Sequence, residues 1–306
     1  MGEWPRVAVV GAGAVGGYFG GMLARAGADV LMIGRKAFVE TVNRRGLLLD
    51  TVTFKEVVHV RASTEMNAVQ GADIVLFCVK TTDTVATAKI LAPFLSPDMT
   101  LLCLQNGVDN VEAVTKFTNI AACPAVVYLA AMVPEPGWVK HSGRGDLVIG
   151  PESLRIRKVV DLFGRAGVSC RISNRIDDEL WEKFICNCGL NAVSALCQAT
   201  YGRIRDDADA WSLVEAAVAE GMEVAHASGF SPFAKGGVES AIAAVSRLTQ
   251  QIAGAVSSTA QDLHRGKATE IGSLNGFMSK RGSKLKVSTP VNQALYALVK
   301  LHCRNK

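Results

Sequence analysis

The sequence lacks the features that identify several protein classes. It has no apolar run of about 18 residues, the length that a membrane-spanning helix needs. Its 33 Lys and Arg against 28 Asp and Glu give a net charge of only +5, and no polybasic tract is interleaved with aromatic residues. We therefore expect neither a membrane span nor a nucleic-acid partner.

Histidine is scarce, and the cysteines do not fall into metal-binding or disulfide patterns. There are five histidines, without ligand-like spacing to the cysteines, and none of the eight cysteines belongs to a C-x-x-C pair. We expect reduced cysteines in a cytoplasmic protein, with no disulfide framework and no metal site. Because the first apolar segment starts almost at the N-terminus, we also expect no signal peptide.

A glycine fingerprint stands near the start of the chain. Gly11, Gly13 and Gly16 follow the apolar run 6–10, and a helical segment (17–26) and a second apolar run (29–33) come next. The first glycine allows a tight turn, the second lets backbone approach a pyrophosphate, and the third lets the helix pack on the strand. The pattern predicts a dinucleotide-binding βαβ unit; the alternative is a glycine-rich turn kept for backbone reasons alone.

The residues after the second apolar run bear on which dinucleotide binds. An NAD site usually places a carboxylate there for the ribose 2′-OH. This chain has Arg35 and Lys36 instead. A guanidinium can bind a phosphate bidentately, so we predict NADP(H), with Arg35 contacting the 2′-phosphate. The alternative is a helix start with incidental basic residues.

The pattern of apolar segments predicts an α/β fold. Strand signals at 73–79, 99–104 and 124–132 alternate with helical stretches at 84–91 and 111–117. Shorter strands are predicted at 137–141, 146–149 and 168–172, and residues 46–62 read as a small hairpin or an irregular strand pair. The sequence thus predicts a Rossmann-type, doubly wound and mostly parallel sheet over residues 1–173, followed by an all-α domain over 174–306. The apolar C-terminal helices either pack on one another or form a homodimer interface.

Polar residues follow two of the predicted strands. Lys80 and Asn106 stand where the carboxyl ends of a parallel sheet would face a ligand, Lys80 near phosphate charge and Asn106 near the nicotinamide. The alternative is that strands simply end in polar loops, since Asn-Gly is a common turn.

A polar stripe interrupts the predicted apolar helix 178–198. Asn187, Asn191 and Ser194, with Lys183 before and Gln198 after, lie three or four residues apart and fall on one face. A solvated face is the alternative, but such faces usually carry several long charged side chains. Amides in a buried helix need partners, and a small substrate would provide them.

In these segments the chain resembles the ketopantoate reductase family (2-dehydropantoate 2-reductases), over essentially its whole length. The matching segments are residues 11–16, 78–80, 105–107, 179–183 with Asn187 and Asn191, 257–262, 269–271, 275–276 and 289–290.

The resemblance implies an enzyme that reduces 2-dehydropantoate to (R)-pantoate in pantothenate biosynthesis, with NADPH as the hydride donor. It also implies roles for individual positions. Lys183 would be the general acid, and the substrate would contact Asn106, Asn187, Asn191 and Ser258. The cofactor would contact Gly11, Ala12, Gly13, Ala14, Val15, Gly16, Arg35, Lys80, Asn106, Ala130 and Glu270.

Some positions have alternative interpretations or depart from the family pattern. Glu270 could be an ordinary first-turn carboxylate, and we favour a structural ion pair for Asp262. Gly272 stands where the family often has an acidic residue, and a further family amide is matched only by the candidates Gln198 and Tyr201. Because of these departures, the alternative that the protein is a reductase of another small 2-keto acid stays open. A noncatalytic NADP-sensing module is a third reading, which would not need the residues of the polar stripe.

Overall fold

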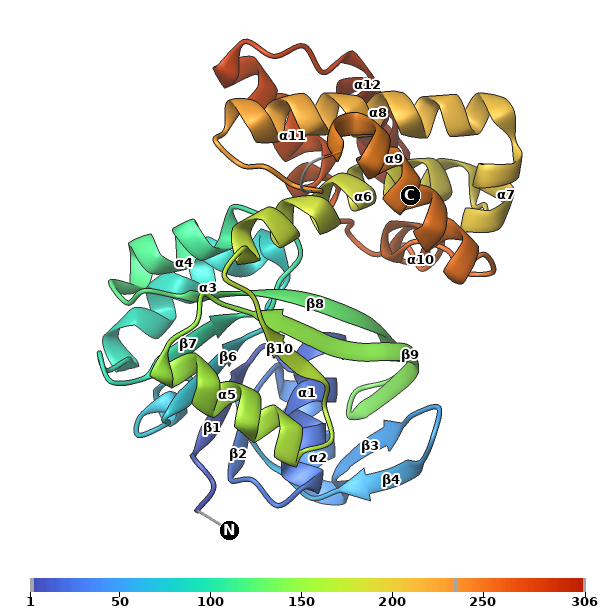
Figure 1. Ribbon diagram of the computed structural model, residues 1–306. Coiled ribbons are helices and arrows are strands. Elements are labelled where there is room, and N and C mark those ends of the chain that lie inside the picture. Colours follow the sequence, from blue (N-terminus) through green and yellow to red (C-terminus); the bar gives the residue numbers. More distant parts are fainter. Residues whose placement is uncertain (1–2, 234–235, 305–306) are drawn as a thin grey trace. The chain divides into compact units, whose positions relative to one another are not determined.

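The computed structural model describes residues 3–233 and 236–304. The chain divides into two compact units, Met1–Ile176 and Asp177–Lys306. The first unit alternates strands and helices, and the second is helical, in agreement with the predicted fold class (Figure 1). Helix α6 (Ile176–Cys197) starts at the last residue of the first unit and otherwise belongs to the second.

The first unit is built on a ten-stranded mixed sheet with the strand order β4-β3-β9-β8-β7-β6-β1-β2-β5, and β10 pairs with β9. The strands are β1 (Val7–Val10), β2 (Val30–Ile33), β3 (Leu47–Asp50), β4 (Lys55–Val58), β5 (Arg61–Ser63), β6 (Ile74–Phe77), β7 (Thr100–Cys103), β8 (Cys123–Met132), β9 (Trp138–Ile149) and β10 (Cys170–Ile172). The pairs β3–β4 and β8–β9 are antiparallel, and the other pairs are parallel.

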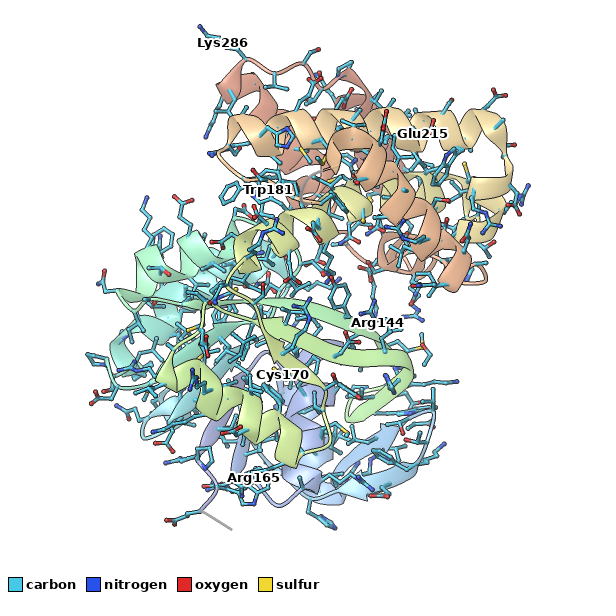
Figure 2. The ribbon with its side chains drawn as sticks, in the orientation of Figure 1. Arg144, Arg165, Cys170, Trp181, Glu215 and Lys286 are labelled. Atoms are coloured by element: carbon cyan, nitrogen blue, oxygen red, sulfur yellow. The ribbon has the colours of Figure 1, made fainter. Side chains whose placement is uncertain are left out.

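Two details of the sheet differ from the sequence prediction. The strands predicted at 137–141 and 146–149 are one strand, β9, which pairs with β8 through two register shifts. Arg144, which has a φ of 51° and falls between the two predicted segments in the sequence, is part of β9 (Figure 2). Its polar neighbours and Gly143 resemble a turn in sequence, whereas the irregularity is a bulge inside a strand. Residues 46–62 contain the β3–β4 hairpin and also the start of β5, which joins β2 in parallel.

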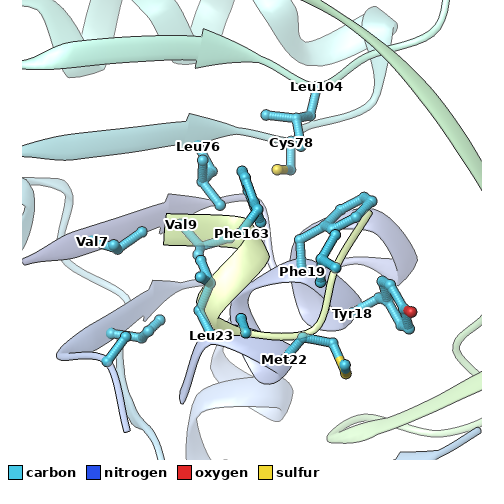
Figure 3. Packing of buried hydrophobic residues seen from close by; sticks show 14 of the residues in the cluster. Val7, Val9, Tyr18, Phe19, Met22, Leu23, Leu76, Cys78, Leu104 and Phe163 are labelled. Atoms are coloured by element: carbon cyan, nitrogen blue, oxygen red, sulfur yellow. The ribbon is translucent and has the colours of Figure 1, made fainter. Parts of the chain in front are cut away.

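Both faces of the parallel strands are buried, which explains their uninterrupted apolar sequences. Val7, Val9 and Leu76 point into the core beneath α1 (Ala14–Arg25) and α5 (Leu154–Arg165), where Phe19 and Phe163 pack (Figure 3). The alternate residues of the same strands face the other side. There they pack with residues of α3 (Thr84–Leu91) and α4 (Asn110–Thr118). Helix α2 (Lys36–Arg45) follows β2.

The described part of the second unit contains α6 and six further α-helices. These are α7 (Tyr201–Asp206), α8 (Ala208–Ala227), α9 (Gly237–Gln251), α10 (Ser258–His264), α11 (Asn275–Leu285) and α12 (Pro290–Arg304). Helix α8 packs against α7, α9, α11 and α12. Its buried Glu220 accepts hydrogen bonds from the backbone N–H groups of Val291 (2.8 Å) and Asn292 (2.9 Å), which fixes the start of α12.

Candidate active site

Four loops leave the same edge of the sheet in the first unit. Strands β7, β6, β1 and β2 are neighbours and run parallel, so the loops that follow them lie side by side. In that order these loops contain Asn106, Lys80, the glycine fingerprint and Arg35. Their carboxyl-end edge is where open α/β sheets bind ligands. An elongated ligand along this edge would meet the four groups in sequence.

The three fingerprint glycines have different reasons to be glycine. Gly11 has a φ of +98°, and a Cβ there would stand 2.7 Å from the Val79 nitrogen. A Cβ on Gly16 would stand 2.2 Å from the Gly11 oxygen. A Cβ on Gly13 would meet no described atom within 4 Å. The described fold therefore requires glycine at positions 11 and 16, whereas no described contact requires it at position 13.

The same loop presents a helix N-terminus. Ala14 and Val15 begin α1, after the N-cap Gly13, and Ala12 is half-buried before it. Within the described residues, no side chain caps this end and the first turn has no acidic residue. Backbone N–H groups of the first turn have no partners inside the helix, and the dipole there favours an anion. The loop can therefore bind phosphate groups.

Arg35 stands at the start of α2, directly after β2. Its side chain is 95% exposed, and its guanidinium lies 3.8 Å from the Asp83 carboxylate. An exposed pair at this distance contributes little to stability, so it would cost little to exchange Asp83 for another anion. The sequence did not reveal this contact, because Asp83 lies far along the chain, just before α3.

The loops that carry Lys80 and Asn106 are joined by hydrogen bonds. The Thr81 hydroxyl donates to the Asn106 carbonyl oxygen at 3.1 Å, and the Asn110 amide donates to the same oxygen at 2.7 Å. Lys80 is exposed and Asn106 is half-buried. Burial raises the pKa of the Asp109 carboxyl at the end of this loop. Residues 106–109 of this loop are half-buried.

Ala130 lies on the exposed outer half of β8, beyond the residues Cys123 and Pro124 that pair with β7. One of the two register shifts between β8 and β9 falls directly after it, and its carbonyl oxygen accepts a hydrogen bond from Ser142 at 3.2 Å. The Arg144 guanidinium covers the Tyr128 ring at 3.9 Å nearby. The structure therefore places Ala130 at a bulge and not in the row of four loops.

In the second unit, Lys183, Asn187 and Asn191 follow one face of α6 at intervals of four residues. Lys183 and Asn187 are half-buried, and Asn191 is only 4% exposed. Among the described residues, the Asn187 side chain has no hydrogen-bond partner. The Asn191 Oδ1 accepts from the Tyr201 hydroxyl at 3.2 Å, which leaves its Nδ2 as an unused donor there. Two amides are thus available to a ligand.

Tyr201 acts on the candidate site through Asn191. Burial, and secondarily the Cys186 side chain, raises the pKa of the Tyr201 hydroxyl well above its ordinary value. A tyrosine hydroxyl is protonated near neutral pH even at its ordinary pKa, so it is a donor here. Because it donates to Oδ1, it fixes which side of the Asn191 amide is the acceptor and which is the donor.

The structure corrects the prediction for the C-terminal part of the stripe. The Ser194 hydroxyl donates to the Ala199 oxygen at 2.8 Å and accepts from the Ser257 nitrogen at 3.1 Å. Gln198 lies past the end of α6 with a φ of 48°, and its amide donates to the Ala195 oxygen. Both side chains complete the backbone hydrogen bonding where the helix ends, so they do not extend the ligand-facing stripe.

Ser258 is brought to α6 by its neighbour. Ser257 caps α10, because its hydroxyl accepts a hydrogen bond from the Ala260 nitrogen at 3.0 Å. The same hydroxyl donates to the main-chain carbonyl oxygen of Asn191 at 3.1 Å. Ser258 is the next residue and is exposed. Sequence reasoning missed the role of Ser257, although a serine directly before a helix is a common cap.

Glu270 lies after α10, where it precedes the short 3-10 helix η5 (Ile271–Ser273). Its side chain is half-buried, and its carbonyl oxygen accepts from the Ser273 nitrogen at 2.9 Å. Glu270 is thus the N-cap residue of η5 and not part of its first turn, which differs from the alternative interpretation, and its contact with a cofactor stays a prediction.

The described residues offer neither a metal site nor a membrane span. They contain no cluster of three or more His, Cys, Asp or Glu side chains arranged to hold a metal ion. Among their helices, none combines the length and the apolar character needed to cross a membrane.

Comparison with known proteins identifies the family. The family model described as ketopantoate reductase PanE/ApbA matches residues 7–153, and the model for its C-terminal part matches residues 175–302. The 2-dehydropantoate 2-reductase of Pyrococcus abyssi is 30% identical over 303 residues, which cover 96% of this chain and 97% of that protein. The chain therefore belongs to the ketopantoate reductase family and is an oxidoreductase.

Solved structures agree with this assignment. The crystal structure of a PanE/ApbA family ketopantoate reductase from Ralstonia eutropha JMP134 has a TM-score of 0.92 and 41% identity, and the match covers 98% of this chain and 99% of that one. A D-mandelate dehydrogenase bound to NADH and anilino(oxo)acetate has a TM-score of 0.89 at 23% identity and covers 98% of each chain, a likeness of fold alone. Family membership indicates a nicotinamide dinucleotide cofactor and a small keto-acid substrate.

Substitution of two fingerprint glycines should separate dinucleotide binding from folding. Gly16→Ala should lower the free energy of unfolding by about 1–3 kcal/mol, because the new Cβ overlaps the Gly11 oxygen. Gly13→Ala, in open space, should cost about 1 kcal/mol or less as a change at a helix N-cap, yet weaken NADPH binding about tenfold or more by blocking backbone approach. Urea unfolding and fluorescence titration with NADPH measure the two effects. Unchanged NADPH affinity in Gly13→Ala would contradict the assignment of this loop.

Proposed function

We propose that this protein reduces 2-dehydropantoate to (R)-pantoate with NADPH as the hydride donor. The observation that carries the proposal is the stripe of Lys183, Asn187 and Asn191 on a helix that is otherwise largely buried. The amide donors of this stripe are not used up by the described protein groups. Family membership and 30% identity to a named 2-dehydropantoate 2-reductase support the substrate.

NADPH, rather than NADH, is supported by the residues after β2. Arg35 has a 95% exposed guanidinium held only loosely by Asp83, and the loop in which it stands lies at one end of the row of four loops. Asn106 is at the other end, with the phosphate-binding glycine loop and Lys80 between them. This order fits a dinucleotide with its 2′-phosphate at Arg35 and its nicotinamide towards Asn106.

The chemistry assigns a role to each side chain. Bound NADPH supplies the hydride for the C2 carbonyl carbon. As the carbonyl oxygen gains negative charge, the Lys183 ammonium stabilises it and then donates a proton to it, which gives the alcohol. The amides of Asn187 and Asn191 and the hydroxyl of Ser258 bind the carboxylate and hydroxyl of the substrate and orient the carbonyl. Glu270 and Ala130 are proposed cofactor contacts.

A reductase of another small 2-keto acid is the second candidate. Gly272 supports it, because it stands where the family often has an acidic residue. The core chemistry would be unchanged, since any 2-keto acid presents a carbonyl beside a carboxylate. A noncatalytic sensor of NADP is less well supported, because such a protein would have no use for Lys183 and the two amides.

The deciding experiment is a spectrophotometric assay of the purified protein. NADPH oxidation is followed with 2-dehydropantoate and with a panel of other 2-keto acids, and each is repeated with NADH. We expect the highest kcat/KM with 2-dehydropantoate and NADPH. Turnover of another keto acid, without turnover of 2-dehydropantoate, would favour the second candidate function. NADPH binding without any turnover would favour the sensor.

Arg35→Ala should lose affinity for NADPH specifically. Loss of the charge-assisted hydrogen bonds to the 2′-phosphate should raise the KM for NADPH about 10- to 100-fold and leave the KM for NADH nearly unchanged. Arg44→Ala, an exposed arginine in the last turn of α2, serves as the control. An equal change for both cofactors would mean that Arg35 does not bind the 2′-phosphate.

Lys183→Ala should remove the proton donor and leave cofactor binding intact. Because general acid catalysis contributes typically ~10²–10⁴-fold, we expect kcat to fall by about that factor, while the Kd for NADPH stays close to that of the unmodified protein. Lys280→Ala, on the exposed face of α11, is the control. Strong activity in Lys183→Ala would overturn its assignment as the acid.

A further inference from the structure

Three buried polar side chains lie beneath the loops of Lys80 and Asn106. Thr84 is 2% exposed, Asn110 is 3% exposed and Gln105 is 6% exposed. They come from the first residue of α3, the first residue of α4 and the loop after β7. Burying polar groups is costly unless they are hydrogen-bonded. The hydrogen bonds of these three side chains therefore show which parts of the protein they connect.

The three side chains form one chain of hydrogen bonds. The Gln105 Nε2 donates to the Thr84 hydroxyl at 2.8 Å, and that hydroxyl donates to the Asn110 Oδ1 at 2.9 Å. The Thr84 hydroxyl is therefore the central link, since it is acceptor to one neighbour and donor to the other. We call these three residues the Thr84 network.

Both ends of the network are main-chain carbonyl groups of the two loops. Gln105 Nε2 also donates to the Val79 oxygen at 2.8 Å, directly before Lys80. At the other end, Asn110 Nδ2 donates to the Asn106 oxygen at 2.7 Å, and the Thr81 hydroxyl donates to that oxygen from the first loop. The bonds therefore fix the peptide groups beside Lys80 and Asn106.

The backbone after Asn106 is flexible enough that these hydrogen bonds decide its conformation. Gly107 has a φ of +101°, a conformation with little steric restraint at glycine. Without external bonds, the peptide between Asn106 and Gly107 could rotate with little steric cost. Two hydrogen bonds to the Asn106 oxygen hold this peptide, and the direction of the Asn106 side chain follows from it.

We propose that Thr84 and Asn110 are positioning residues, which hold Asn106 and the Lys80 loop in the geometry that hydride transfer requires. This inference rests on the proposed function, in which Asn106 contacts substrate and cofactor. Neither Thr84 nor Asn110 touches a reacting atom in this scheme. Their effect reaches the reaction through the backbone of Asn106.

Substitutions at Thr84 test the proposal with little change of shape. Thr84→Val keeps the branched side chain and removes the hydroxyl, whereas Thr84→Ser keeps the hydroxyl. The control is Thr118→Val, which removes another buried hydroxyl of the same unit. That hydroxyl donates to the Val114 oxygen within its own helix, α4, and is not part of the Thr84 network.

We expect Thr84→Val to lower kcat about 10- to 100-fold, as a displacement of about 1 Å at a reacting group can do. Thr84→Ser should retain kcat within about threefold, because both hydrogen bonds can still form. Thr118→Val should lose comparable thermal stability but keep its kcat. If Thr84→Val and Thr118→Val have the same kcat, the positioning role is wrong.

A double-mutant cycle distinguishes positioning from general damage. If the network acts through Asn106, Thr84→Val should have little effect on kcat in an Asn106→Ala background. The same loss in both backgrounds would mean that Thr84 does not act through Asn106, and the proposal would be wrong.

A measurement without turnover separates this inference from the proposed function. Hydrogen–deuterium exchange of the NADPH-free protein, read by mass spectrometry over residues 104–110, should be about tenfold faster in Thr84→Val than in Thr118→Val, because the peptide group is released. Unchanged exchange overturns the positioning role even if the enzyme is active. Absence of keto-acid reduction by the unmodified protein, with faster exchange in Thr84→Val, overturns the proposed function and leaves the restraint of the loop confirmed.

Discussion

Burial of both faces of strands β7, β6, β1 and β2 is the constraint on which the first unit depends. A strand that faces helices on both sides cannot carry polar side chains along its length, so its polar residues are confined to its ends. Because these strands are parallel neighbours, their carboxyl ends open at one edge. Arg35, the glycine loop, Lys80 and Asn106 are therefore aligned as a consequence of the packing.

The glycine loop shows how closely folding and binding requirements are combined. Gly11 and Gly16 allow β1, α1 and the Val79 segment to approach one another, and no larger residue fits there. Gly13 is not required by any such contact. Glycine is a favourable N-cap residue and also leaves room for a phosphate group there, and the N-terminus of α1, which no described side chain caps, provides the matching positive end of a dipole.

In the second unit, polar side chains lie on a helix that is otherwise buried. Most of α6 is apolar and buried, and the amides on its polar stripe would be costly there without partners. The described protein groups provide only some of the hydrogen-bond partners: the Tyr201 hydroxyl donates to the Asn191 Oδ1, and the Ser257 hydroxyl donates to the main-chain oxygen of Asn191. These bonds fix the amide and leave its donor side to a ligand. The buried carboxylate of Glu220 plays a structural part, as it fixes the start of α12.

Short-range periodicity and fixed spacing were enough to predict most of the strands and helices, the dinucleotide fingerprint and the polar stripe from the sequence. The partners of the individual side chains became known from the three-dimensional structure. It joined residues 137–141 and 146–149 into one bulged strand, and it assigned Ser194 and Gln198 to the end of α6. It also placed Asp83 beside Arg35 and linked Gln105, Thr84 and Asn110 beneath Asn106. These contacts join residues from different elements, and a hydrogen bond depends on the positions of two groups in space, which spacing along one chain segment does not specify.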